Sequence, residues 1–453
     1  MKTPSSKFQV TALLLVAHLA HGAEPLPLST SYWKDPAFLK SFNGSYRIEA
    51  RIEPAVSTDE RGLLVEVQKS MEDGERKAAL AKLKGSSLTA KSAALTFNLA
   101  NLYFETGELD DAEKAYRKAI EDYPSFRRAH RNLGVLLVRK EKTEDALKHL
   151  IEAVRLGDSD GSTYGMIGYC RLEQGEWASA LQAYRMAQVS EPDAVEWKAG
   201  VAQCLQQLDE TSEAVALLDE VIRRRPEEAG YAELQAGMLI ELGRLDDAVK
   251  ALELPRRLGR LSGDGLLLLA ELNLRESRSE DALALVPEAF AAGTKPTDGR
   301  LMAVLGFATS VREWEVARAL LEKAREQIKG EAPRPLRLAE AKLEIDSDEA
   351  PDKGVEMLSK LIEEDPTDGV ALLELGKYEV SRGKPGEGEL LLERATAVEQ
   401  VAADAWVEIA KLRVGESRFG AALTAVDEAL KLRPGGSLQD YRDSLAKLAD
   451  AAN

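Results

Sequence analysis

A residue pattern returns every 34 residues along much of this chain. From about residue 93 to 226, the same kinds of side chain recur at the same register in successive copies. Small residues occupy two of these registers: Ala100, Gly134, Gly168 and Ala202 in one, and Ala112, Ala146, Ala180 and Ala214 in the other. A fixed period of this length indicates tandem helix–turn–helix units that stack into a solenoid, and it argues against a compact enzyme core.

One copy of the pattern shows how each unit should fold. A first helix is expected over 98–105, where apolar residues have helical spacing and Gly107 follows. A second helix is expected over 109–120 and ends before Pro124, because proline cannot continue a helix. The small residues mark places where two antiparallel helices approach closely. One hairpin alone leaves an apolar face exposed, so stacking must supply the core.

The unit resembles the tetratricopeptide repeat. Two copies carry the resemblance most fully: Leu99-Ala100, Tyr103, Gly107, Leu109, Ala112, Tyr116, Ala119 and Pro124 in one, and Ile167-Gly168, Gly175, Trp177, Ala180, Tyr184, Ala187 and Pro192 in the other. The resemblance implies an all-α fold, a right-handed α-solenoid of about ten helix hairpins.

The period also predicts the organisation of the chain. The solenoid is expected over 93–436, with units near 93, 127, 161, 195, 229, 263, 298, 332, 369 and 403. Residues 59–92 are interpreted as a degenerate helical hairpin, and 437–453 as a helix that covers the end of the stack. Pro255 and Pro287 fall where second helices should still be running. We expect short or bent helices there, with a functional hinge as the alternative.

The first residues have the order of a secretory signal peptide. Two lysines precede the apolar stretch 10–20, and Ala20 and Gly22 form a small-x-small cleavage site, so 1–22 should be removed. The apolar stretch is shorter than the ~18 residues of a spanning helix, so no transmembrane segment is expected in the mature chain. We therefore predict an exported protein that is periplasmic or associated with the outer membrane.

Residues 23–58 form an aromatic-rich segment ahead of the first hairpin. Trp33 and Phe38 lie in a cluster of aromatic residues around Pro36. We favour an N-terminal cap that hides the open end of the solenoid. The alternative is a docking segment through which Trp33 and Phe38 bind another envelope protein.

Charge and residue usage disfavour several classes of function. The chain has 60 Lys and Arg against 77 Asp and Glu, a formal charge of −17, which is a poor match for nucleic acid or anionic membranes. The sequence contains no clustered His/Cys ligand set, glycine-rich phosphate loop or nucleophile elbow. We therefore expect no metal, no cofactor and no enzymatic activity.

The few histidines and cysteines fit packing roles. His130 falls where the repeat family places a large packing residue, which favours a core histidine over a catalytic base. Cys170 and Cys204 lie one period apart at an apolar position. Equivalent points on adjacent helices are ~8–10 Å apart, beyond the ~7 Å that a disulfide spans between Cα atoms. Two buried free thiols are favoured, with a disulfide as the alternative in an exported protein.

The concave groove of the solenoid is the predicted binding surface. The fifth, ninth and twelfth residues of each first helix are rotated by about 100° from the packing face, so they should line the groove. The candidate residues are Phe97, Asn101, Phe104, Arg128, Arg131, Asn132, Arg139 and Tyr169. Aromatic, arginine and amide side chains on one face favour an extended peptide with an acidic or carboxylate group.

One subgroup of the family grips C-terminal carboxylates through asparagines and basic residues. Asn101 and Asn132 match the asparagine places, but Phe97, Gly165 and Tyr169 stand where basic residues belong. The specificity of that subgroup is therefore not carried over.

These observations together predict an exported, non-enzymatic scaffold with protein or peptide partners in the cell envelope. The layout resembles exported bacterial tetratricopeptide proteins, and within that set we favour an accessory of TonB-type energised transport. One alternative is a peptide-binding module that captures acidic or aromatic segments in the groove. Another is a factor in the assembly of envelope polysaccharide or of the outer membrane.

Overall fold

The computed structural model describes residues 32–34, 36, 38 and 53–452. The proposed signal peptide and most of the aromatic-rich segment lie outside these residues. The described residues form helices and no strands, and helix follows helix in hairpins, so the predicted all-α solenoid is confirmed. None of the described helices has the length and apolar character required to cross a membrane.

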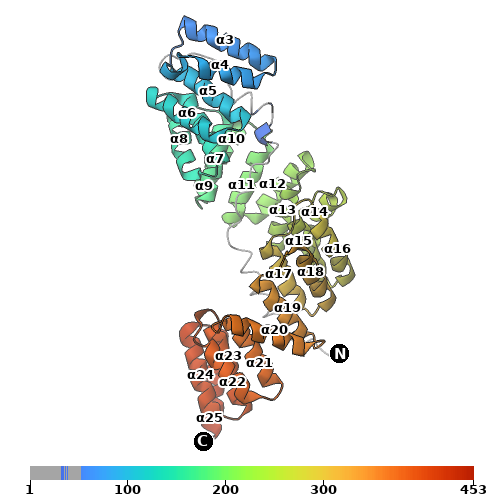
Figure 1. Ribbon diagram of the computed structural model, residues 1–453. Helices are drawn as coiled ribbons and strands as arrows, with labels where there is room; N and C mark the ends of the chain where they lie inside the picture. The colour runs from blue at the N-terminus through green and yellow to red at the C-terminus, as the bar shows by residue number, and fades with distance from the viewer. Residues whose placement is uncertain (1–31, 35, 37, 39–52, 453) are drawn as a thin grey trace. The chain divides into compact units, whose positions relative to one another are not determined.

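The chain divides into two compact units, Met1–Pro255 and Arg256–Asn453. Figure 1 labels their helices. The helices of the first unit are η1 (Tyr32–Lys34), α3 (Thr58–Glu72), α4 (Arg76–Gly85), η2 (Thr89–Lys91), α5 (Ala93–Thr106), α6 (Leu109–Asp122), α7 (Arg127–Arg139), α8 (Thr143–Arg155), α9 (Gly161–Glu173), α10 (Trp177–Ser190), α11 (Val195–Gln207), α12 (Thr211–Arg224), α13 (Ala229–Glu241) and α14 (Leu245–Arg257), which contains the boundary. Those of the second are α15 (Gly263–Arg275), α16 (Ser279–Ala291), α17 (Asp298–Ser310), α18 (Trp314–Gln327), α19 (Arg334–Asp346), α20 (Pro351–Glu364), α21 (Gly369–Ser381), α22 (Pro385–Ala395), α23 (Glu399–Gly415), α24 (Phe419–Leu432) and α25 (Gly436–Ala452).

Successive helices pair into hairpins that stack on one another within each unit. In the first unit α5 pairs with α6, α7 with α8, α9 with α10 and α11 with α12, and the first helices α7, α9 and α11 also contact their neighbours. The hairpin α3–α4 packs against α5 through α4. In the second unit α24 packs between α23 and α25. Each hairpin thus buries the apolar face of the next.

The small registers of the period are places of helix contact. A Cβ atom on Gly134 would lie 2.5 Å from Leu150 Cγ, and one on Gly168 would lie 2.8 Å from the Tyr184 ring. The turn after the first helix is equally regular. Gly107 ends α5 with φ of 85°, and Glu141 takes the equivalent left-handed place after α7 with φ of 59°. The turn geometry therefore persists where glycine is missing.

The structure corrects one of the two expected effects of the prolines, which is a shortened helix. Pro255 and Pro287 lie inside α14 and α16, which are not short, since each has 13 residues. A proline removes only one backbone N–H from a helix. Burial of Leu252 in α14 and of Val286 in α16 holds these helices against their neighbours. The boundary between the two compact units falls at Pro255.

Two repeat units begin away from the expected positions. The units expected near 332 and 403 begin with α19 at Arg334 and α23 at Glu399. Helix α22 is short, with 11 residues, and α23 is correspondingly long, with 17. A change in helix length of this kind is invisible to a fixed period.

Candidate protein-binding surface

The eight candidate groove residues differ sharply in accessibility. Arg128, Arg139 and Tyr169 are partly or fully exposed. The other five are buried: Phe97, Asn101, Phe104, Arg131 and Asn132. This corrects the expectation that all eight line an open groove. Two causes account for the burial, a polar network between repeats and a cover supplied by the chain's own N-terminal segment.

The polar network links the hairpins α5–α6, α7–α8 and α9–α10 through residues that the sequence suggested as ligand contacts. Tyr116 Oη donates to Asn101 Oδ1, and Asn132 Nδ2 donates to the same oxygen at 3.0 Å. Arg131 Nη1 lies 3.0 Å from Asp160 Oδ2, and Asp160 Oδ1 caps α9 by accepting from the Ser162 amide. Burial raises the pKa of Tyr116, which keeps its hydroxyl protonated as a donor. The side-chain amides of Asn101 and Asn132 therefore stabilise the packing between repeats.

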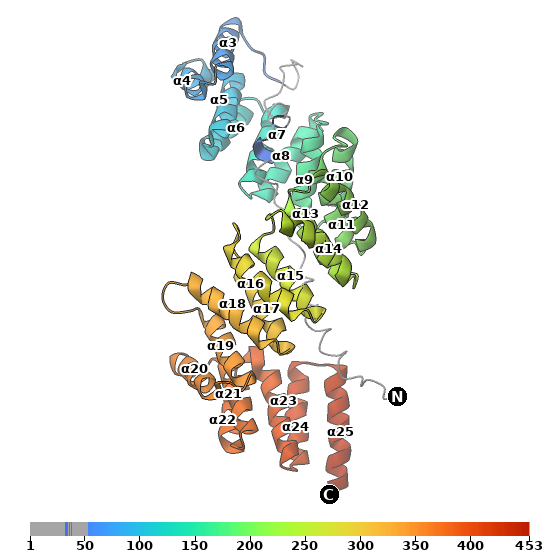
Figure 2. The ribbon, with the colours of Figure 1, turned by 90° about the vertical axis from the view of Figure 1, so that its right-hand side faces the viewer.

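The cover consists of residues from the aromatic-rich segment. The Tyr32 ring lies 5.7 Å from the Trp197 ring of α11, in an edge-on arrangement at 71°. The Trp33 ring lies 6.0 Å from the guanidinium of Arg139 on α7. The short η1 helix that carries both is the isolated blue segment in Figures 1 and 2. Part of the segment 23–58 thus contacts the first helices of the repeats.

This placement also corrects the interpretation of the aromatic residues as an end cap. Tyr32, Trp33 and Phe38 form one cluster, with ring centroids 4.9 to 5.7 Å apart. The cluster meets α7 and α11, whereas the hairpin α3–α4 is what packs on α5. Aromatic side chains bury the most apolar area per residue, so they seek a face with other rings.

An acidic residue closes the other end of the cover. Glu53, only 2% exposed, lies against the start of α7, with its Oε2 atom 3.0 Å from Arg128 Nε and its Oε1 atom 3.9 Å from Arg127 Nη2. Burial raises the pKa of Glu53, and the two arginines act in the opposite direction. The sequence predicted an acidic ligand for a groove that contains Arg128, and an acidic side chain of the chain itself lies beside this residue.

Arginine and aromatic side chains alternate along this surface. The guanidinium of Arg128 lies 5.3 Å from the Phe97 ring, and that of Arg139 lies 5.0 Å from the Phe104 ring. Both distances are within the range of cation–π attraction, which is worth about 0.5–2 kcal/mol per pair. We call the face made by Arg128, Arg139 and Tyr169, together with the buried rings of Phe104 and Trp197, the first-helix surface.

Trp197 is the residue of this surface that sequence reasoning missed. Its indole Nε1 donates to Glu191 Oε2 at 2.8 Å. Its ring packs so closely on Gly165 that a Cβ atom on this glycine would lie 2.5 Å from the ring. It also stacks on Tyr184 with centroids 6.3 Å apart. The sequence did contain a signal for this contact. Gly165 on one first helix and Trp197 on the next form a small–large pair, which is typical of a ring packed on a glycine.

The histidines and cysteines take packing roles. His130 is buried, with its Nδ1 atom 3.1 Å from His149 Nδ1 and its Nε2 atom 3.0 Å from the Pro124 carbonyl. Cys170 and Cys204 are both free and buried, and burial raises the pKa of each thiol to about 12. Within the described residues, no group of three or more His, Cys, Asp or Glu side chains could hold a metal ion.

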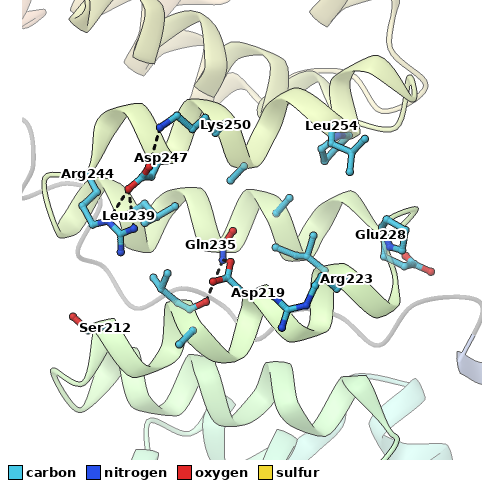
Figure 3. Close-up of a pocket in the computed structure, with 17 residues that line it drawn as sticks. Ser212, Asp219, Arg223, Glu228, Gln235, Leu239, Arg244, Asp247, Lys250 and Leu254 are labelled. Atoms are coloured by element: carbon cyan, nitrogen blue, oxygen red, sulfur yellow. Dashed lines mark hydrogen bonds and ion pairs between the residues drawn. The ribbon is translucent and has the colours of Figure 1, made fainter.

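Figure 3 shows a separate pocket of about 440 Å³ between α12, α13 and α14. Five of its polar side chains form hydrogen bonds with one another. Gln235 Nε2 donates to Asp219 Oδ1 at 2.6 Å, and Asp247 accepts from Arg244 at 2.9 Å and Lys250 at 3.2 Å. A second cavity, of about 350 Å³, lies in the second unit and is mostly apolar. Neither cavity presents a convergent set of polar groups that points to a ligand.

Models of the tetratricopeptide repeat match this chain over residues 97–161, 136–195 and 373–437, and a second form of the model matches 171–238. The chain is 24% identical over 177 residues to the tetratricopeptide repeat-containing protein trd-1 of Caenorhabditis elegans, an alignment that covers 33% of this chain and 23% of that protein. It is 24% identical over 169 residues to Superkiller protein 3 of Schizosaccharomyces pombe, covering 36% of this chain and 12% of that protein. The chain thus matches less than a quarter of the length of either relative.

Several solved structures resemble it in fold. A tetratricopeptide repeat protein from Parabacteroides merdae is 16% identical, with a TM-score of 0.42, and the match covers 58% of this chain and 98% of that one. PilF of Pseudomonas aeruginosa is 18% identical, with a TM-score of 0.38, over 44% and 90% of the two chains. YrrB, described as having an unusual peptide-binding site, is 19% identical, with a TM-score of 0.30, over 53% and 96%.

Proposed function

Because the chain is a tetratricopeptide repeat protein, a scaffold for protein–protein interaction, we propose that it binds extended segments of its partners along the first-helix surface. One observation supports this location above all. Residues of the chain's own N-terminal segment already lie there, held by ring contacts at Trp197 and by an ion pair at Arg128. A surface that accommodates aromatic side chains and a carboxylate from one segment has the chemistry to accept them from another.

The proposed setting is the cell envelope. It is supported by the sequence alone, in which lysines, an apolar stretch and small residues follow one another over residues 2–22. Within that setting we propose an accessory role in an envelope assembly, such as TonB-type energised transport. The role is a binding role, so it requires no catalytic group and no cofactor.

A peptide-binding module is the second candidate. The alternation of arginines and aromatic rings along α5 and α7 favours it, because these side chains recognise acidic and aromatic segments. The two candidates differ in the source of the bound segment, which is part of an envelope assembly in the first and an isolated acidic or aromatic peptide in the second.

Crosslinked affinity purification from the native envelope tests the proposal. The tagged wild-type chain is compared with Arg139→Glu, because Arg139 is exposed on the first-helix surface, whereas Arg131 is buried in an ion pair with Asp160. Arg155→Glu is the matched control, since Arg155 is exposed on α8 and pairs with Glu152 of its own helix. We expect specific partners to be lost only with Arg139→Glu. Partners retained by all three proteins would exclude the first-helix surface as the binding site.

A further inference from the structure

We propose that Tyr32, Trp33, Phe38 and Glu53 form an internal ligand of the first-helix surface, and that an external partner must displace them with an aromatic and acidic segment of the same chemistry. The inference rests on the proposed function. It adds the chemical class of the partner and the competition that controls its access.

The aromatic part of the internal ligand meets a prearranged site. Residues outside the internal ligand hold Trp197, because Glu191 accepts a hydrogen bond from its indole and Tyr184 stacks on its ring. Gly165 leaves room for the same ring, since any larger residue would collide with it. Tyr32 then adds an edge-on contact to an existing platform. An aromatic side chain from a partner would find the same platform.

The centre of the site favours an aromatic ring, because a positively charged guanidinium lies beside it. Arg139 lies between Phe104 and Trp33, with 5.0 Å and 6.0 Å from its guanidinium to the two ring centroids. Burial lowers the pKa of Arg139. The rings displace part of the water around the Arg139 guanidinium. Cation–π attraction to an aromatic ring of the ligand then replaces some of the stabilisation that this water gave.

The acidic end of the internal ligand is only partly satisfied. Glu53 Oε2 receives a hydrogen bond from Arg128 Nε at 3.0 Å. Glu53 Oε1 is buried and has no hydrogen-bond partner. A buried carboxylate oxygen without a donor weakens docking, because the water that it lost is not replaced. A partner carboxylate that is placed to accept more bonds would therefore bind better than Glu53.

Covalent attachment offsets this weakness. A ligand on the same chain acts at an effective concentration of the order of millimolar, so even a poor ligand occupies its site most of the time. A free segment of the same intrinsic affinity then binds with an apparent affinity reduced by roughly 10- to 100-fold. The internal ligand thereby selects for partners that match its chemistry and exceed its affinity.

The test uses a fluorescein-labelled synthetic peptide of residues 29–56 as the probe and the full chain as the receptor. Binding is followed by fluorescence anisotropy for the wild type and for the triple variant Tyr32→Ala, Trp33→Ala, Phe38→Ala. We expect the triple variant to bind the probe roughly 10- to 100-fold more tightly than the wild type. Adding Arg139→Ala to the triple variant should reverse the gain. Val189→Ala is the control, because Val189 is 79% exposed on α10.

A milder variant checks the acidic end. Glu53→Gln keeps the shape of the side chain and removes its charge, so it should strengthen probe binding several-fold without loss of the aromatic contacts. Helix content by circular dichroism verifies that each variant is folded.

Three outcomes separate the inference from the proposed function. Equal affinity of the wild type and the triple variant would overturn the internal competition and leave the binding function standing. No binding of the probe to a folded triple variant would overturn the shared ligand chemistry, while the affinity purification would still decide the function. A gain in probe affinity without any partner that depends on Arg139 would support occupancy of the surface by the internal ligand, but it would reject the proposed function and, with it, the inferred chemistry of the partner.

Discussion

Replacing Asn132 by alanine should lower the local stability of the hairpins that contain α5, α7 and α9, and should not affect the second unit. Asn132 is fully buried, at 0% exposure. Its amide donates to Asn101 Oδ1 at 3.0 Å, and its Oδ1 atom accepts from Arg131 Nε at 3.3 Å. The variant removes both bonds and leaves a cationic donor and an amide oxygen each with one partner fewer.

The cost follows from these two bonds. The neutral hydrogen bond contributes about 1 kcal/mol and the bond to the charged group about 2 kcal/mol, so the region should lose about 3 kcal/mol. Because 1.4 kcal/mol corresponds to a factor of ten, the opening equilibrium should rise by roughly 100-fold.

Native-state hydrogen exchange measured by mass spectrometry resolves the effect by region. A two-unit chain need not unfold in one step, so a single melting curve would mix the two contributions. We expect faster exchange of about two orders of magnitude in α5, α7 and α9, and no change in α15 or α16. Asn273→Ala is the matched control, since buried Asn273 accepts from Arg278 Nε at 2.8 Å in the second unit and should give the opposite regional pattern. A change below threefold in α5–α9, or an equal change in both units, would refute the structural role of Asn132.

Two further predictions concern the first unit. Burial lowers the pKa of His149 to about 4 from its usual 6.5. As the pH falls from 6.5 to 4, the unfolded chain therefore takes up a proton that the folded chain does not, and the free energy of unfolding declines by about 1 kcal/mol after allowance for partial exposure. In His149→Asn, the urea midpoint should depend less steeply on pH. An unchanged slope would contradict this prediction. Gly165→Ala should destabilise the unit by about 1–3 kcal/mol and shift tryptophan emission to the red, because the new Cβ atom collides with the Trp197 ring. Gly85→Ala, with nothing within 4 Å, should leave the emission unchanged.

The residue pattern was a good guide to the helices because repeat proteins depend on short-range contacts. Each hairpin packs mainly on its neighbours, so apolar spacing, small registers and turn residues specify it locally. Helices α5, α7, α9 and α11, which open four successive hairpins, begin at Ala93, Arg127, Gly161 and Val195, one period apart. The prediction of shortened helices at the two prolines was wrong because burial of the neighbouring side chains outweighs the effect of proline on helix length, and a residue pattern does not show that burial.

The candidate site was harder to predict for a different reason. Helical geometry placed Asn101, Arg131 and Asn132 on the inner side of the first helices, but position on a helix face does not say whether a side chain is already engaged. The three are joined to one another and to Asp160 across successive repeats. Arg139, on the same side of α7, remains exposed.

The all-helical class, the 34-residue unit and the registers at which helices touch could be read from the residues alone, because these features depend on residues a few turns apart. What covers the first helices of the repeats became visible only in the folded chain. Glu53 and Arg128 are 75 residues apart in the chain, and Tyr32 reaches Trp197 across four hairpins. Such contacts follow from how the chain returns upon itself, and no periodic pattern encodes that return.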